Sequence, residues 1–317
     1  MAGPLDLTYQ YSHPSRATSN GVHLAASGGA SPCPELFTGK VAKLATTTAA
    51  LAALSDIGAL HFASTSTQLR FLRDPICNAI DGRISFEALS HCATTYARLE
   101  IDSNGLSGEF PEPGSSNVDI NSLPRGTLRS IDAAAPVRFF IGGTPEVSPR
   151  MKQRSRSRAR RDEPAGTIIS LDRDWLYAID SSQALLASME QVFELDQVAA
   201  ERLLSGLPRA RPLSLLWLVD TGRRLRFTRD TPIEGVPVSG VERLQPLTEL
   251  LPHLRRLTIH RDRASSTCAW VAELSGNQRF ISLLSESAAE PLWTPEAPGD
   301  ELFHFGTEAT TKRLLPF

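Results

Sequence analysis

Three short runs of the sequence contain residue types that perform catalysis or bind nucleotides in other proteins, but each lacks a required neighbour. The run His-Arg-Asp at 260–262 has the order of a kinase catalytic loop, yet Thr267 stands where that loop needs an asparagine. The Gly-Lys pair at 39–40 lacks the upstream glycine and the following Ser or Thr of a P-loop. No Gly-x-Ser-x-Gly run occurs, so a hydrolase nucleophile is not indicated.

Candidate metal ligands and paired carboxylates are equally incomplete. His91 and Cys92 are adjacent, and neighbouring side chains of a strand point to opposite faces, so the pair is not expected to hold one ion. No second Cys/His pair follows at zinc spacing, and Cys92 is expected to be a half-buried structural cysteine. Asp172 or Asp174 is expected to begin a helix. A pocket holding His91, Asp119 or Asp172 would instead indicate an enzyme assembled from distant residues.

A basic run at 150–161 is the strongest local signal. Removing its seven positive charges from the net charge of −2 leaves −9, so the run is an exception in an acidic protein. Such a run favours a solvated linker, and it could also bind phosphates or an acidic partner, with Ser155 and Ser157 as sites of charge reversal by phosphorylation. No aromatic residue interleaves it, unlike in a single-strand binder. The candidate binding residues are Arg150, Lys152, Arg154, Arg156, Arg158, Arg160 and Arg161.

Composition places the chain among ordinary folded proteins. It has 317 residues, of which 41% are hydrophobic and 21% charged, with a pI of about 6.4. That balance argues against a dedicated nucleic-acid binder. The four cysteines show no Cys-x-x-Cys spacing, which favours a reducing compartment, and no signal peptide is recognised, so a cytoplasmic location is expected. The apolar stretch 41–62 is interrupted by Lys43, Asp56 and His61, which favours a soluble helix over a membrane span.

The elements that must position these residues follow from periodicity. In the first half, strands are expected at 7–11, 21–25, 83–86, 95–101 and 137–141, with an Ala-rich helix over 40–60. Asn104-Gly105 indicates a turn that could close a hairpin. The second half is expected to hold helices over 174–189, 195–204 and 244–251, and strands at 167–170, 213–219, 224–228, 256–260, 267–274 and 279–284. Trp217 lies in an apolar run and is expected in the core.

These elements predict an α+β fold with mixed or antiparallel sheets and packed helices, in two parts joined by a basic loop. The expected divisions are an N-terminal α+β domain over 1–148, the basic linker or insertion over 149–164, a C-terminal α+β domain over 165–290 and a Pro/Glu-rich tail over 291–317. The tail contains Trp293 and is expected to pack on its own domain or to add an arm to a partner.

Several stretches together resemble one known family. Residues 9–30 (YQYSHPSRATSNGVHLAASGGA), 33–40 (CPELFTGK) and 84–121 (including FEALSHCATTYARLEI and GEFPEPGSSNVDIN) are similar to the N-terminal region of bacterial SWIM zinc-finger family proteins, and so are residues 203–226 and 254–286. The resemblance covers most of residues 5–285 and rests on turns and strands rather than catalytic signatures. It implies a bacterial cytoplasmic protein that accompanies MoxR-type AAA+ ATPases and von Willebrand A-domain proteins.

The sequence departs from that family at its defining motif. The CxC…CxH zinc motif is absent from these 317 residues, so neither zinc binding nor the DNA-binding role of the SWIM module is implied for this chain. A SWIM-bearing companion chain could supply the module. The leading hypothesis is therefore a non-enzymatic interaction or scaffold protein without cofactor, metal or membrane partner, serving an AAA+ ATPase or SWIM-bearing partner. The alternative is a nucleic-acid-binding protein that uses the basic run.

Overall fold

The computed structural model describes much of the chain between residues 7 and 292. The described residues are 7–9, 11–18, 21–27, 33–60, 74–120, 123, 126, 128, 138–143, 169–171, 173–209, 214–232, 234–288 and 292. The basic run and the tail after 292 lie outside them, so the two-part division, with its basic joining loop, stays a prediction. None of the helices in this part of the chain has the length and apolar character needed to cross a membrane.

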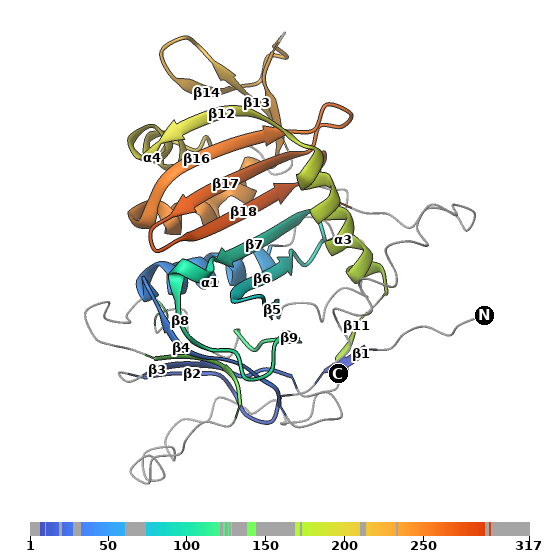
Figure 1. Cartoon of the computed structure of the whole chain (residues 1–317). Helices are drawn as coiled ribbons and strands as arrows, with labels where there is room; N and C mark the ends of the chain where they lie inside the picture. The colour runs from blue at the N-terminus through green and yellow to red at the C-terminus, as the bar shows by residue number, and fades with distance from the viewer. Residues whose placement is uncertain are drawn as a thin grey trace, which may run out of the picture.

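The largest sheet has eight strands in the order β12-β16-β17-β18-β7-β6-β5-β9 (Figure 1), and every neighbouring pair is antiparallel. Strands from both halves of the chain meet where β7 pairs with β18. The bounds are β5 Ile76–Ile80, β6 Arg83–Leu89, β7 Thr95–Ile101, β9 Gly114–Asn117, β12 Glu190–Asp196, β16 Leu254–Arg261, β17 Cys268–Leu274 and β18 Gln278–Leu284.

Helices α1 (Leu44–Gly58) and η4 (Val241–His253) pack against each other on one face of this sheet. Alternate residues of β7, such as Ala97 and Leu99, point toward them and are completely buried. The start of α1 is held by Gln278 of β18, whose Nε2 donates to the Lys43 carbonyl while its Oε1 accepts from Thr47 Oγ1. These bonds satisfy polar groups that the apolar surroundings would otherwise leave unpaired.

The remaining helices flank the sheet at different places. Helix α4 (Gln197–Ser205) continues directly from β12; the Asp196 carboxylate caps it by accepting from the Ala199 N–H at 2.8 Å. It packs on η4 and β16, on the same side as α1. Helix α3 (Arg173–Ser188) crosses the opposite face near one end of the strands (Figure 1). Only this helix, among the described elements, covers that second face.

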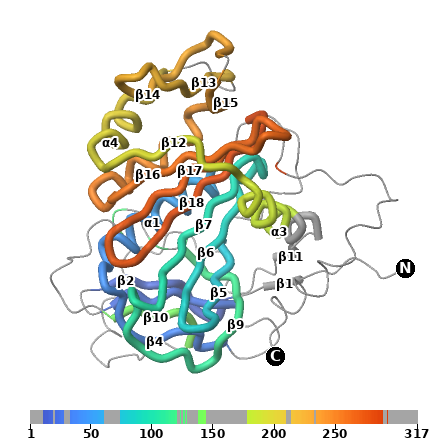
Figure 2. Tube along the Cα trace, turned by 45° about the horizontal axis from the view of Figure 1, so that its top comes forward, coloured from blue at the N-terminus to red at the C-terminus, as the bar shows by residue number. Residues whose placement is uncertain are grey.

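Smaller sheets lie at the two ends of the molecule (Figure 2). One has five strands in the order β2-β3-β10-β4-β8 and is mixed, because β3 and β10 are parallel. The second is β14-β13-β15, and β1 pairs with β11. Their bounds are β1 Leu7–Tyr9, β2 Arg16–Thr18, β3 Gly21–Leu24, β4 Glu35–Val41, β8 Leu106–Glu109, β10 Arg138–Gly142, β11 Ile169–Leu171, β13 Leu215–Asp220, β14 Leu225–Thr228 and β15 Val236–Ser239.

The expected α+β fold with mixed and antiparallel sheets is confirmed, whereas three local elements differ from the expectation in their bounds, helix type or pairing. The helix expected from residue 40 begins at Leu44, because β4 occupies 35–41. Asn104-Gly105 forms a short 3-10 turn, η2 (Ser103–Gly105), and β8 then pairs with β4 instead of returning along β7. The segment expected as a helix over 244–251 is a longer 3-10 helix, η4, which contains Pro246 and Pro252.

Candidate functional site

The candidate site is the face of the eight-stranded sheet opposite α1 and η4, called here the open face. Cross-strand register arranges its side chains in rows that run across the strands. The first row is mostly apolar and comprises Leu89, Tyr96, Leu283, Ala269 and His260. Helix α3 covers this row with Ala178 and Ile179, which are buried against it. The apolar row therefore explains why α3 lies at this end of the strands.

Two further rows remain uncovered by α3 along most of their length. The second row mixes charged and apolar side chains: Ile76, Glu87, Arg98, Ile281, Val271, Thr258 and Glu194. The third row is entirely polar: Asn78, Ser85, Glu100, Arg279, Glu273 and Arg256. Four neighbouring positions of the third row thus alternate between acid and base.

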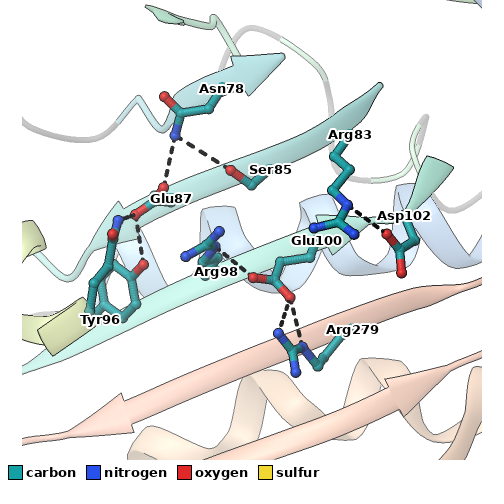
Figure 3. Close-up of polar contacts among 10 residues, drawn as sticks. Asn78, Arg83, Ser85, Glu87, Tyr96, Arg98, Glu100, Asp102 and Arg279 are labelled. Atoms are coloured by element: carbon teal, nitrogen blue, oxygen red, sulfur yellow. Dashed lines mark hydrogen bonds and ion pairs between the residues drawn. The ribbon is translucent and has the colours of Figure 1, made fainter. Parts of the chain in front are cut away.

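Glu87 is the buried centre of a polar network on this face (Figure 3), with only 2% of its surface exposed. Its carboxylate accepts hydrogen bonds from Tyr96 Oη at 2.7 Å and Asn78 Nδ2 at 2.8 Å. Gln183 of α3 donates to the same carboxylate from Nε2 at 2.6 Å. The network therefore fixes α3 to β6 as well as satisfying a buried charge.

Charge and burial shift the pKa of the groups around Glu87. Burial, followed by the Glu87 carboxylate, raises the pKa of Tyr96 well above its ordinary value. Burial acts to lower the pKa of the Arg98 guanidinium, but Glu87, Tyr96 and Glu100 outweigh burial and raise it. Tyr96 therefore stays a neutral hydrogen-bond donor and Arg98 a cation across the physiological pH range.

Ion pairs connect the charged residues of the open face. Arg279 Nη2 lies 2.6 Å from Glu100 Oε2, and Arg98 Nε lies 3.0 Å from Glu100 Oε1 (Figure 3). Arg256 bridges Glu273 at 2.9 Å and Glu194 at 3.2 Å. The side chains of Arg256 and Glu273 are 46% and 44% exposed, so each such pair contributes little net stability and is open to rearrangement.

A groove of about 440 Å³ lies between α3 and these charged rows. Val271 and Ile281 line its apolar part, whereas Gln183, Leu186 and Ala187 of α3 line one side. His260 lines it as well; burial, followed by Arg279, lowers the pKa of His260. A larger hollow of about 730 Å³ shares Arg98, Glu100, Glu273 and Arg279 with the groove and continues along the sheet.

Most of the residues proposed from the sequence lie outside the described part of the chain, and the others do not form a common site. All seven basic candidates, Arg150, Lys152, Arg154, Arg156, Arg158, Arg160 and Arg161, lie outside the described residues, and so does Asp172. His91 and Cys92 lie in the turn between β6 and β7, not on a strand as expected. Asp119 is buried and accepts the Ser15 N–H at 3.0 Å. Neither His91 nor Asp119 lines the groove.

The Gly-Lys pair at 39–40 contributes to strand packing and not to a nucleotide-binding loop. Gly39 lies in β4, where an added Cβ would be 2.4 Å from the Ser107 carbonyl oxygen of β8, so the glycine permits the two strands to approach.

Burial raises the pKa of Cys33, Cys77 and Cys268, in the last case to about 11. These thiols are held protonated at neutral pH. No group of three or more His, Cys, Asp and Glu within the described ranges could hold a metal ion.

Sequence reasoning missed the open face, although a signal for it exists. In β7 (TYARLEI), Arg98 and Glu100 alternate with Ala97, Leu99 and Ile101, which is the pattern of a strand with one apolar and one polar face, whereas β18 (QRFISLL) contributes only Arg279 as a charged residue. Which charges become neighbours depends on the pairing of β7 with β18, and that pairing joins residues far apart in sequence.

Comparison of the sequence with known proteins identifies no relative. No family model matches the chain, and no curated protein matches it. Among solved structures, the chain is similar to the crystal structure of a PCNA2-PCNA3 complex from Sulfolobus tokodaii, with 7% identity and a TM-score of 0.48. That match covers 80% of this chain and 100% of the other. The likeness is weak.

Proposed function

We propose that this chain is a non-enzymatic interaction or scaffold protein that binds a protein partner in the groove beside α3. The observation that carries the proposal is the composition of the groove: apolar Val271 and Ile281 flanked by arginines and glutamates that are already paired. An apolar centre with a polar rim rich in arginine is typical of protein–protein interfaces.

The pairing of the charges favours a partner that is recognised by shape and by local hydrogen bonds. Because acids and bases alternate along the third row, their long-range fields largely cancel, so the groove does not select one sign of charge. The half-exposed ion pairs Arg256–Glu273 and Arg256–Glu194 cost little to break. A partner segment lying beside α3 can therefore replace one member of a pair while its apolar side chains contact Val271.

The test is an affinity purification from native lysate with two matched variants. Val271→Arg places a charge in the apolar part of the groove, whereas Val198→Arg places one on α4, where Val198 is 54% exposed. We expect the co-purifying partner to fall by about ten-fold or more with Val271→Arg, the loss typical of disrupting an interface centre, and to persist with Val198→Arg. Circular dichroism of both variants verifies that each remains folded.

A co-purifying set that Val271→Arg leaves unchanged contradicts the groove assignment, and a turnover activity lost with a point mutation contradicts the non-enzymatic proposal. The finer proposal, that the partner belongs to a MoxR-type ATPase or von Willebrand A-domain system or carries a SWIM module, is decided by the identity of the protein lost. A nuclease-treated sample separates partners bound directly from those bound through nucleic acid.

A further inference from the structure

The hairpin formed by β13 and β14 carries four arginines: Arg223, Arg224, Arg226 and Arg229. All four are exposed, and none has a side-chain hydrogen bond or ion pair with another described residue. By contrast, Arg98, Arg256 and Arg279 on the open face each have a carboxylate partner. Because residues 215–230 also contain Asp220 and Asp230, the four arginines leave this hairpin with a net charge of +2 on a chain whose net charge is −2.

Among the described strands, none pairs with the outer edge of this hairpin. In the sheet order β14-β13-β15, β14 is an outer strand. The Thr221 N–H donates to the Arg224 carbonyl across the tight turn, where Gly222 has a φ of 77°. Because hydrogen-bonded pairs alternate in an antiparallel ladder, Arg224, Arg226 and Thr228 direct their backbone polar groups toward β13. The backbone N–H and C=O groups of Leu225 and Phe227 consequently point away from the sheet.

The side chains on either side of this edge differ in character. Leu225 and Phe227 are half-buried and pack against the main core, on the face of β13 that contains buried Leu216 and Leu218. Arg224 and Arg226 lie on the other face, together with Val219 and Trp217. The expectation that Trp217 is a core residue is wrong: the indole is half-buried on this outward face, whereas Trp270 is completely buried.

We propose that the free edge of β14 binds an extended acidic segment of a partner protein by strand addition. Backbone hydrogen bonds to Leu225 and Phe227 would hold the added strand, as in other cases of β-augmentation. Its alternate side chains would be acidic beside Arg224 and Arg226, and apolar beside Leu225 and Phe227. The expected ligand is thus a strand in which acidic and β-branched residues alternate.

Charged side chains on a sheet edge also serve to prevent uncontrolled pairing. The arginines repel basic strands and further copies of the same hairpin, but they attract an acidic strand. Selectivity for acidic strands therefore follows from the same residues. This surface is separate from the groove beside α3, so the two proposals stand or fail independently.

The experiment measures binding of the full chain to fluorescein-labelled peptides by anisotropy at low salt. The probe is the peptide EVEVEVE; the controls are KVKVKVK and EVEPEVE, which has the same charge but a central proline that cannot donate to a ladder. We expect EVEVEVE to bind, KVKVKVK not to bind, and EVEPEVE to bind at least about ten-fold more weakly, because both ladder geometry and charge are required. Oligo(dT) serves as a competitor that represents nucleic acid.

Two protein variants and an exchange measurement locate the binding. Arg226→Glu is expected to weaken EVEVEVE binding by about ten-fold or more, whereas Arg202→Glu, at an exposed position of α4, changes it by less than about two-fold. Hydrogen exchange at the amides of Leu225 and Phe227 is expected to slow on binding. No EVEVEVE binding, equal binding of EVEPEVE, unchanged exchange at these amides, or tighter binding of oligo(dT) at the same arginines would each overturn the proposal.

Discussion

At the scale of single residues, Arg243 is the most constrained charge in the described part of the chain. Its guanidinium is fully buried and donates to the carbonyls of Ser239, Thr94 and Ser285 and to Ser285 Oγ. Burial lowers its pKa to about 10, so it remains charged at neutral pH. One side chain thus ties η4 to β15, to the turn before β7 and to the end of β18.

We predict that Arg243→Ala lowers the free energy of unfolding by about 3 kcal/mol or more, because it leaves buried carbonyl groups unpaired and opens a cavity. Urea unfolding measures the change. Arg202→Ala on the surface of α4 is the control and is expected to change stability by less than about 0.5 kcal/mol. A similar loss for both variants would show that the buried network is not a main source of stability.

Neither Arg243 nor Glu87 is recognisable as buried from the sequence. Both are charged residues in segments where apolar neighbours alternate with polar ones, so each is expected on an accessible surface. Their burial depends on partners from other elements: Ser285 and Thr94 for Arg243, and Gln183 and Tyr96 for Glu87. The burial and the hydrogen-bond partners of these two residues could therefore not be predicted from the sequence.

At the scale of elements, α3 determines the shape of the groove. A helix in this segment, ending near Met189, is confirmed with bounds Arg173–Ser188, and so is a helix over 195–204, as α4. The sequence did not indicate which face of which sheet α3 covers, because the apolar row beneath it is assembled from β6, β7, β17 and β18. Helix boundaries follow local signals, whereas docking depends on distant strands.

We predict that Ile179→Asp releases α3 from the open face without unfolding the sheet, because it places a charge against buried Leu283 and Tyr96. Hydrogen exchange by mass spectrometry should show faster exchange over 173–188 and unchanged protection in β7 and β18. Ala184→Asp, at an exposed position of the same helix, is the control and should behave as the wild type. Faster exchange throughout β7 would instead mean that α3 is required for the sheet to form.

Strand predictions succeeded for segments with a clear apolar pattern, such as 95–101 and 137–141, and missed others, including β5 in the local hairpin β5–β6. The hairpins β5–β6, β13–β14 and β17–β18 connect neighbouring segments through short turns, and the expected β13–β14 hairpin across Thr221-Gly222 is confirmed. Strand β12 (EQVFELD) was not expected, because its acidic residues and its direct continuation into α4 resemble a helix start. Its strand character depends on pairing with β16, more than fifty positions away in the sequence.

At the scale of the whole molecule, residues from both halves of the chain build one sheet and one groove. Arg98 and Glu100 come from β7, whereas Val271, Glu273 and Arg279 come from β17 and β18. The α+β class followed from the sequence, but the pairing of β7 with β18 did not, because such long-range contacts leave no local pattern. The proposed division into domains and the resemblance to SWIM-family proteins stay predictions.

The most direct test of a protein-binding groove beside α3 is site-specific photo-crosslinking, which maps the face of the molecule that contacts the partner. A photoreactive phenylalanine derivative replaces Gln191, which is exposed and lines the groove, or Val198, which is exposed on α4. We predict a discrete crosslinked partner from position 191 and none from position 198. No partner from position 191, or the same products from both positions, would contradict a protein-binding groove beside α3.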